Sequence, residues 1–157
     1  MSNSIHLIGS YEVSLDAKGR FLLPKVYKDQ LPEGQKEEFV LGMGFEKCLK
    51  LYPKSEWMAL SAVFAKYSPI NKNVDRMRRS FNAYADIIFL DSAGRLNISK
   101  KLCEKVGLTK NIKLISLGNC IEIWDVDTYH AYEEQEEDLG NITDEITGGN
   151  YLNPFTA

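Results

Sequence analysis

The chain contains 157 residues, of which 44% are hydrophobic and 26% are charged, and this composition is typical of a soluble globular domain. The first residues contain neither a basic start nor an apolar stretch of signal-peptide length, and no segment approaches the roughly 18 apolar residues of a membrane span. These features argue against a secreted or membrane protein, so we expect a cytoplasmic protein with no membrane partner.

The formal net charge is −3, but the charges are distributed unevenly. The segment from Glu122 to Glu145 holds ten acidic residues and no lysine or arginine, which leaves 19 basic and 12 acidic residues elsewhere, a net charge of +7. A basic body is compatible with a polyanionic partner. A solvated acidic helix and tail explains the C-terminal charge equally well.

Residue types that usually carry catalysis or metal binding are sparse. The cysteines, Cys48, Cys103 and Cys120, are odd in number and form no Cys-x-x-Cys, so they indicate small buried side chains rather than disulfides or a zinc site. The two histidines, His6 and His130, have neither a partner nucleophile nor metal-ligand spacing. We therefore expect no metal, no cofactor and no enzymatic activity.

In chain order, the first elements are a strand, a turn, a strand, a helix and a strand pair. Strands are predicted at 11–15 and 21–23, on either side of the turn Asp16-Ala-Lys-Gly-Arg20. A helix follows from Pro24, whose fixed φ suits the first helical position. The segments FVLGMG and CLKLY then predict two further strands that end at Tyr52.

Two helices are predicted next, within 54–66 and 74–84, and the segment SPINKN separates them. Their apolar residues recur at helical spacing and exceed the needs of a small core, which predicts head-to-tail association of subunits through these helices. The second helix also carries three arginines, Arg76, Arg78 and Arg79, for which a solvated face is a simpler interpretation than contact with DNA or a neighbouring subunit.

The second half of the chain repeats the order of the first. LDAKGRFLLP, from Leu15, has its counterpart in LDSAGRLNIS, 75 positions later, and strands, helix and strand pair again follow the turn. Ser99 is expected to cap the helix and Gly107 to end it. A last helix, capped by Asp127, is expected to reach about Asp138, and 140–157 is predicted to be a polar tail without periodicity.

The paired turns are the candidate functional site. Each combines an aspartate, a glycine and an arginine, namely Asp16, Gly19 and Arg20 in the first copy and Asp91, Gly94 and Arg95 in the second. The glycine supplies the positive φ of a three-residue loop, while the aspartate accepts backbone N–H bonds and lies close enough to pair with the arginine. A guanidinium held at an exposed tip can read guanine or grip a phosphate, with Lys18 adding charge in the first copy. Alternatively, the Asp–Arg pair only staples the turn.

Four segments of the chain, YEVSLDAKGRFLLPKVYKDQL, FVLGMGFEKCLKLYPKSEW, LDSAGRLNISKKLCEKVGL and NCIEIW, resemble the MraZ family of bacterial transcriptional regulators in the AbrB-like superfamily. The resemblance extends from about Ile8 to Tyr129. It implies an α+β fold, an AbrB-like swapped-hairpin (double-split) β-barrel built from two internal repeats with helices outside. The expected divisions are repeat 1 at 8–54, connecting helices at 55–85, repeat 2 at 86–129 and a helix end with an acidic, polar tail at 130–157.

The same resemblance implies a DNA-binding transcriptional regulator that forms ring-shaped homo-oligomers and associates with the nucleoid. Its expected target is double-stranded DNA carrying direct repeats, in the promoter of the division and cell-wall gene cluster that includes its own gene. The residues expected to contact DNA are Lys18, Arg20 and Arg95, with Asp16, Gly19, Asp91 and Gly94 supporting the motif.

The chain departs from the family pattern in its second turn. Asn97 and Ser99 stand where the family usually has an apolar residue and a proline, and Ala93 stands where the first turn has Lys18. We therefore expect a smaller share in DNA contact for the second turn. The alternative function is that of an AbrB-like, antitoxin-like interaction module whose main partner is a protein.

Overall fold

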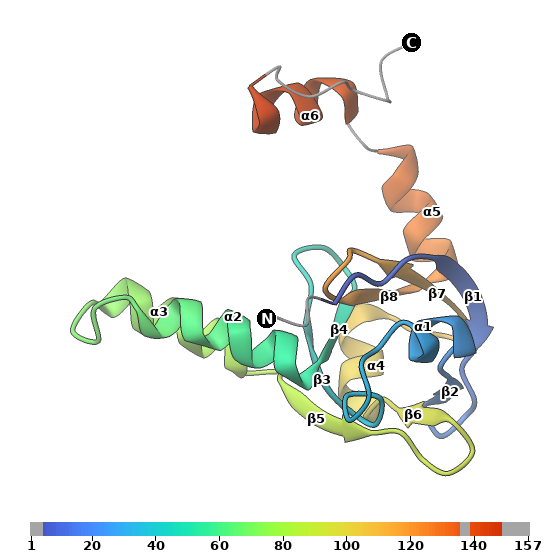
Figure 1. Ribbon diagram of the computed structural model, residues 1–157. Coiled ribbons are helices and arrows are strands. Elements are labelled where there is room, and N and C mark those ends of the chain that lie inside the picture. Colours follow the sequence, from blue (N-terminus) through green and yellow to red (C-terminus); the bar gives the residue numbers. More distant parts are fainter. Residues whose placement is uncertain (1–4, 136–138, 149–157) are drawn as a thin grey trace. The chain divides into compact units, whose positions relative to one another are not determined.

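A computed structural model describes residues 5–135 and 139–148 of the chain (Figure 1). This part of the chain forms two compact units that divide after Val126, and it contains eight strands, all antiparallel in their pairing, and six helices. In chain order the elements are β1 (Ser10–Ser14), β2 (Arg20–Leu22), α1 (Lys25–Asp29), β3 (Glu38–Met43), β4 (Leu49–Pro53), α2 (Lys54–Ala65), α3 (Lys72–Asn82), β5 (Asp86–Phe89), β6 (Arg95–Asn97), α4 (Lys100–Val106), β7 (Asn111–Ser116), β8 (Ile121–Asp125), α5 (Val126–Glu134) and α6 (Leu139–Thr147). The fold is thus α+β. No helix in the described ranges is long and apolar enough to cross a membrane.

The two repeats exchange strands with each other. The larger sheet has the order β1-β7-β8-β4-β3-β5, so each repeat contributes one hairpin (β3–β4 or β7–β8) and pairs its first strand with the hairpin of the other repeat. The short strands β2 and β6 pair with each other in a separate two-stranded sheet. In each expected strand–turn–strand unit, the strand before the turn therefore joins the larger sheet and the strand after it joins the two-stranded sheet. The hydrogen-bonded strands do not close into one continuous barrel.

The pairing register has an approximate twofold symmetry. Phe21 lies opposite its counterpart Leu96 in the β2–β6 pair, and Lys50 lies opposite its counterpart Glu122 in the β4–β8 pair. Equivalent positions of the two repeats thus meet at two places in the unit. The symmetry supports the predicted internal repeat, because each strand makes the same kind of pairing in both halves.

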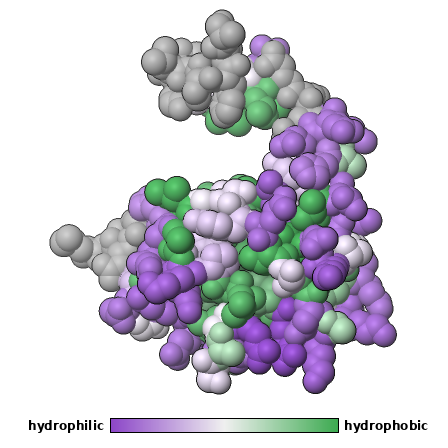
Figure 2. Space-filling model, turned by 90° about the vertical axis from the view of Figure 1, so that its right-hand side faces the viewer, coloured by the Kyte–Doolittle hydropathy of each residue, from purple (hydrophilic) through white to green (hydrophobic). Residues whose placement is uncertain are grey.

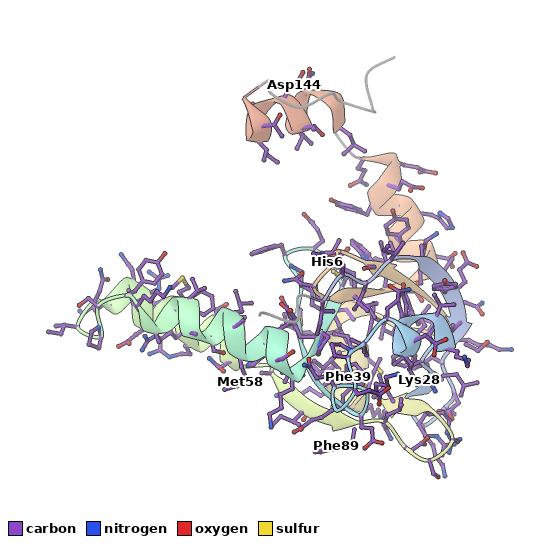
Figure 3. All side chains as sticks on the ribbon, viewed as in Figure 1. His6, Lys28, Phe39, Met58, Phe89 and Asp144 are labelled. Carbon is purple, nitrogen blue, oxygen red and sulfur yellow. The ribbon has the colours of Figure 1, made fainter. Side chains whose placement is uncertain are left out.

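The interior is filled by apolar side chains from both repeats. Phe21 and Leu96 are almost completely buried, as are Leu41 and Leu114 from the two hairpins. In Figure 3, Phe39 lies in the interior among the strands, whereas Phe89 projects outward from β5. Within β5, Ile88 is buried whereas Ile87 and Phe89 are exposed, as expected because successive strand residues point to opposite faces of a sheet.

The helices α2 and α3 pack against each other through aromatic rings. Trp57 of α2 stacks on Phe81 of α3 with ring centroids 4.0 Å apart, and Phe64 meets the same ring edge-on at 4.7 Å. Arg78 donates a hydrogen bond from Nη2 to the Phe64 carbonyl oxygen at 2.8 Å. Much of the apolar stripe expected to face another subunit therefore holds this helix pair together, and Arg78 supports the pair.

The predicted helix boundaries are confirmed for α4 and wrong for the C-terminal region. Ser99 Oγ accepts the Leu102 N–H at the start of α4, and Gly107 ends the helix with a φ of 68°. The helix α5, which the sequence predicts with a cap at Asp127, begins at Val126, so Asp127 lies inside its first turn. The expected tail contains α6, whose residues Leu139, Ile142 and Ile146 recur at helical spacing. The remaining parts of that prediction, 136–138 and 149–157, lie outside the described residues.

Candidate nucleic-acid interface

The first turn is a closed loop between β1 and β2. Asp16 donates its backbone N–H to the Arg20 carbonyl at 2.9 Å, and the Gly19 N–H bonds the Asp16 carbonyl at 3.0 Å. Gly19 adopts a φ of 84°, a conformation that L-residues with a side chain rarely take. The predicted three-residue loop and the role of its glycine are both confirmed.

The Asp16 carboxylate holds three groups of this turn. Its Oδ1 accepts the N–H groups of Lys18 and Arg20, both at 2.9 Å, and its Oδ2 accepts from Arg20 Nε at 2.8 Å. In the described parts of the chain, the terminal nitrogens of the Arg20 guanidinium make no hydrogen bond. The turn thus orients the guanidinium through one edge and leaves the other edge for a ligand.

The second turn reproduces this geometry. Asp91 Oδ1 accepts the N–H groups of Ala93 and Arg95 at 2.9 Å, and Arg95 Nε bonds Asp91 Oδ2 at 3.0 Å. Gly94 has a φ of 81°. The predicted pairing of aspartate and arginine therefore exists in both copies.

The aspartates are held in their charged form by these contacts. The backbone N–H of Arg20, together with the Arg20 side chain and the Lys18 N–H, lowers the pKa of Asp16 below its ordinary value. The backbone N–H groups of Arg95 and Ala93 do the same for the pKa of Asp91. Both carboxylates are consequently ionised at neutral pH, and each turn presents a charge-assisted pair at the surface.

Each turn is anchored to the opposite repeat. Leu15, just before the first turn, donates its N–H to the Lys110 carbonyl at 2.8 Å, and the Gly19 carbonyl accepts from the Ile98 N–H at 2.7 Å. The second turn has equivalent bonds, from Leu90 to the Glu37 carbonyl and from Leu23 to the Gly94 carbonyl. The pairing of β2 with β6 therefore places one turn at each end of this short strand pair, and both turns appear at the lower right of Figure 1.

An open hollow of about 870 Å³ lies beside the first turn. Its lining includes the buried side chains of Leu15 and Ile98, the carboxylate of Asp16 and three exposed lysines, Lys18, Lys100 and Lys110. Figure 2 shows the side of the molecule that β1 borders, where hydrophilic side chains predominate along the lower rim with apolar side chains between them. The hollow combines cationic groups with the turn that carries Arg20.

The structure brings Lys18 and Arg20 together on the first turn and places Arg95 on the second. Sequence reasoning missed Lys100 and Lys110, which lie more than 80 positions further along the chain than the first turn. No local pattern marks them, because the position of Lys110 depends on the pairing of β1 with β7 and that of Lys100 on the pairing of β2 with β6.

The described residues contain no group of three or more histidine, cysteine, aspartate or glutamate side chains that could hold a metal ion. Cys48 and Cys120 are buried, as predicted from the sequence, whereas Cys103 is half-buried, and all three are free thiols. Burial raises the pKa of the Cys120 thiol to about 11 and raises that of Cys48 further. Neither buried thiol is therefore activated as a nucleophile.

Comparison with known proteins agrees with this geometry. Residues 7–80 and 82–148 match the family described as "MraZ protein, putative antitoxin-like". The chain is 39% identical over 145 residues to the transcriptional regulator MraZ of Flavobacterium psychrophilum, covering 90% of this chain and 92% of the relative. It is 36% identical over 146 residues to the transcriptional regulator MraZ of Christiangramia forsetii, covering 92% and 94%. The match extends through α6 and so beyond Tyr129, where the sequence resemblance was expected to end. The chain therefore belongs to the MraZ family.

Proposed function

We propose that the protein is a sequence-specific DNA-binding transcriptional regulator that is not an enzyme. Its targets are direct repeats in double-stranded promoter DNA, upstream of the division and cell-wall gene cluster that includes its own gene. The curated relatives from two bacteria are named as transcriptional regulators, which supports the regulatory part of the proposal.

The observation that carries the DNA-binding part is the Asp-held arginine of the first turn. Arg20 is bonded through Nε to Asp16, so its two terminal nitrogens have a fixed direction. A fixed guanidinium fork suits the bidentate recognition of guanine or of a phosphate. Lys18 on the same loop adds a second cationic group, and Arg95 repeats the arrangement on the second turn with Ala93 in place of a lysine.

A direct test is a titration of the purified protein with duplex DNA from upstream of its own gene. Repeat-bearing DNA is expected to bind more tightly than a scrambled duplex of equal length, and log K should fall steeply with log salt concentration. Equal binding of both duplexes would contradict sequence-specific recognition.

The second candidate function is an antitoxin-like interaction module, and the description of the matching family favours keeping it. In that case the main partner is a protein. An apolar protein interface responds weakly to salt, so the same titration series separates the two functions.

We further propose that the strand exchange completes an AbrB-like swapped-hairpin barrel, and that subunits assemble into a ring associated with the nucleoid in the cytoplasm. Support for assembly comes from apolar side chains that the α2–α3 pair leaves exposed. Ile70, between the helices, is 91% exposed, and Met58 lies on the exposed side of α2 (Figure 3). A heterologous contact that closes on itself produces a ring.

A further inference from the structure

The approximate twofold symmetry allows the surroundings of the two turns to be compared position by position. Around the first turn, Lys100 and Lys110 come from the second repeat. Around the second turn, the equivalent positions belong to the first repeat and are Lys25 and Glu37, because Leu90 bonds the Glu37 carbonyl as Leu15 bonds the Lys110 carbonyl. The position that holds Lys110 beside the first turn thus holds the acidic Glu37 beside the second turn.

The lysines that correspond to each other also differ in their ion pairs. Lys25 pairs with Asp29 at 2.9 Å, and Lys100 pairs with Glu104 at the longer distance of 3.9 Å. Lys28 adds one positive charge beside Gly94, while the first turn carries Lys18 on its own loop. Around the first turn, three lysines (Lys18, Lys100 and Lys110) thus have one neighbouring acid among these ion pairs, Glu104. Around the second turn, three lysines (Lys25, Lys28 and Lys36) are matched by three acids (Asp29, Glu33 and Glu37).

The segment that carries Lys110 is held in place by a buried acid. Thr109 donates both its N–H, at 3.1 Å, and its Oγ1–H, at 2.5 Å, to Oδ1 of Asp125, which is only 5% exposed. In the first repeat the position equivalent to Asp125 is Pro53, since Phe39 pairs with Pro53 as Ile112 pairs with Asp125. A proline offers no side-chain acceptor, so only the first turn has this anchor beside it.

We propose that Lys100 and Lys110 grip the phosphate backbone of the DNA that the first turn reads, and that the second turn has no such grip. This inference rests on the proposed DNA-binding function and deepens it. The reading surface is composite, because the first repeat supplies Arg20 and Lys18 while the second repeat supplies Lys100 and Lys110. The hollow beside the turn gives the backbone room to approach all of them.

The loss of a phosphate contact and the loss of a base contact have different effects on DNA binding. Removing a lysine that contacts phosphate weakens binding to all sequences alike. It also reduces the magnitude of the slope of log K against log salt concentration by about 1. Removing a group that reads a base reduces discrimination between sequences.

The experiment compares Lys100→Ala and Lys110→Ala with the matched control Lys25→Ala and with Arg20→Ala. Each variant is titrated with the repeat-bearing duplex and with a scrambled duplex of equal length, at several salt concentrations. Lys100→Ala and Lys110→Ala are each expected to lose several-fold affinity for both duplexes and to lower the salt slope by about 1 for each engaged subunit. Lys25→Ala is expected to bind like the unmodified protein.

The outcomes separate the inference from the function on which it rests. If Arg20→Ala loses binding while both lysine variants keep the original affinity and slope, the grip is refuted and the DNA-binding function stands. If Lys25→Ala loses as much as Lys100→Ala, the asymmetry is refuted. If the unmodified protein shows no salt-dependent DNA binding, both proposals fall.

Discussion

At the scale of single residues, Arg20 is the position where we expect the proposed DNA binding to be most sensitive to substitution. Arg20→Ala removes a fixed guanidinium and is expected to weaken operator binding by about 1 to 3 kcal/mol for each engaged subunit. If several subunits bind repeated sites together, these losses multiply through avidity. The measurement is a titration on repeat-bearing DNA with melting temperature and oligomer size followed in parallel.

Arg95→Ala is the matched control for this substitution, because its turn has the same geometry but lacks a lysine on the loop. It is expected to weaken binding less than Arg20→Ala. A folded, assembled Arg20→Ala protein with unchanged affinity would return the Asp16–Arg20 pair to the role of a turn staple.

The two aspartates are expected to make the free energy of unfolding depend on pH in the acid range. A carboxyl whose pKa is lower in the folded state contributes stability above its unfolded pKa, and this contribution is lost as the pH falls through the folded value. The pKa of Asp16 lies below 3.8 because Arg20 and Lys18 hydrogen-bond its charged form. The stability advantage of the unmodified protein over Asp16→Asn is thus expected to be constant near neutral pH and to shrink below about pH 4. Urea unfolding at a series of pH values measures it, and an advantage that persists undiminished at low pH would contradict this explanation.

At the scale of elements, the two turns differ in how they tolerate a side chain at their glycine. Both glycines have positive φ, so replacement by alanine is expected to cost about 1 to 2 kcal/mol in either turn. A Cβ on Gly19 would also overlap the Ile98 carbonyl oxygen, whereas a Cβ on Gly94 meets only the flexible end of Lys28 at 3.4 Å. Gly19→Ala should therefore lower the free energy of unfolding more than Gly94→Ala. Denaturant unfolding of both variants tests this order, and equal losses would contradict it.

Elements that depend on local sequence could be predicted, and those that depend on distant pairing could not. The helix α4 has its cap at Ser99 and its end at Gly107, and both signals lie within the helix's own sequence. The helix α6 is an exception, because its three apolar residues lie in a segment rich in glycine, asparagine and threonine, a composition typical of a tail.

The candidate site shows the same division. Its turns were predictable from the sequence because aspartate, glycine and arginine form them within five residues. Lys100 and Lys110 were not, because no local pattern determines that β1 pairs with β7 and β2 with β6.

At the scale of the whole molecule, each repeat pairs only the two strands of its own hairpin and lacks the partners of its other strands. In residues 1–85, β1 lacks β7, β2 lacks β6 and β3 lacks β5. Isolated hairpins are marginally stable in water, so this fragment is expected not to fold as a monomer. Circular dichroism and sedimentation provide the measurement, and a monomeric fragment that melts cooperatively would contradict the expectation.

Assembly is the other prediction at this scale. Met58 and Ile70 are exposed apolar residues of the α2–α3 region, and a charge at either position is costly to bury in an interface. Met58→Lys and Ile70→Lys are expected to reduce oligomer size while leaving the melting temperature of the subunit nearly unchanged. Sedimentation velocity at micromolar concentration checks both variants, and an unmodified protein that is a stable monomer would refute the assembly.

The position of Lys50 opposite Glu122 has a consequence for which halves of such a molecule recognise each other. In a symmetric pair of first repeats Lys50 would face a second Lys50, and in a pair of second repeats Glu122 would face another Glu122. Like charges directly opposite each other destabilise neighbouring strands, and unlike charges stabilise them. Lys50 and Glu122 thus favour pairing of a first repeat with a second repeat over pairing of two identical repeats. If the chain were cut between its repeats, this charge pair would favour reassociation of the two different halves.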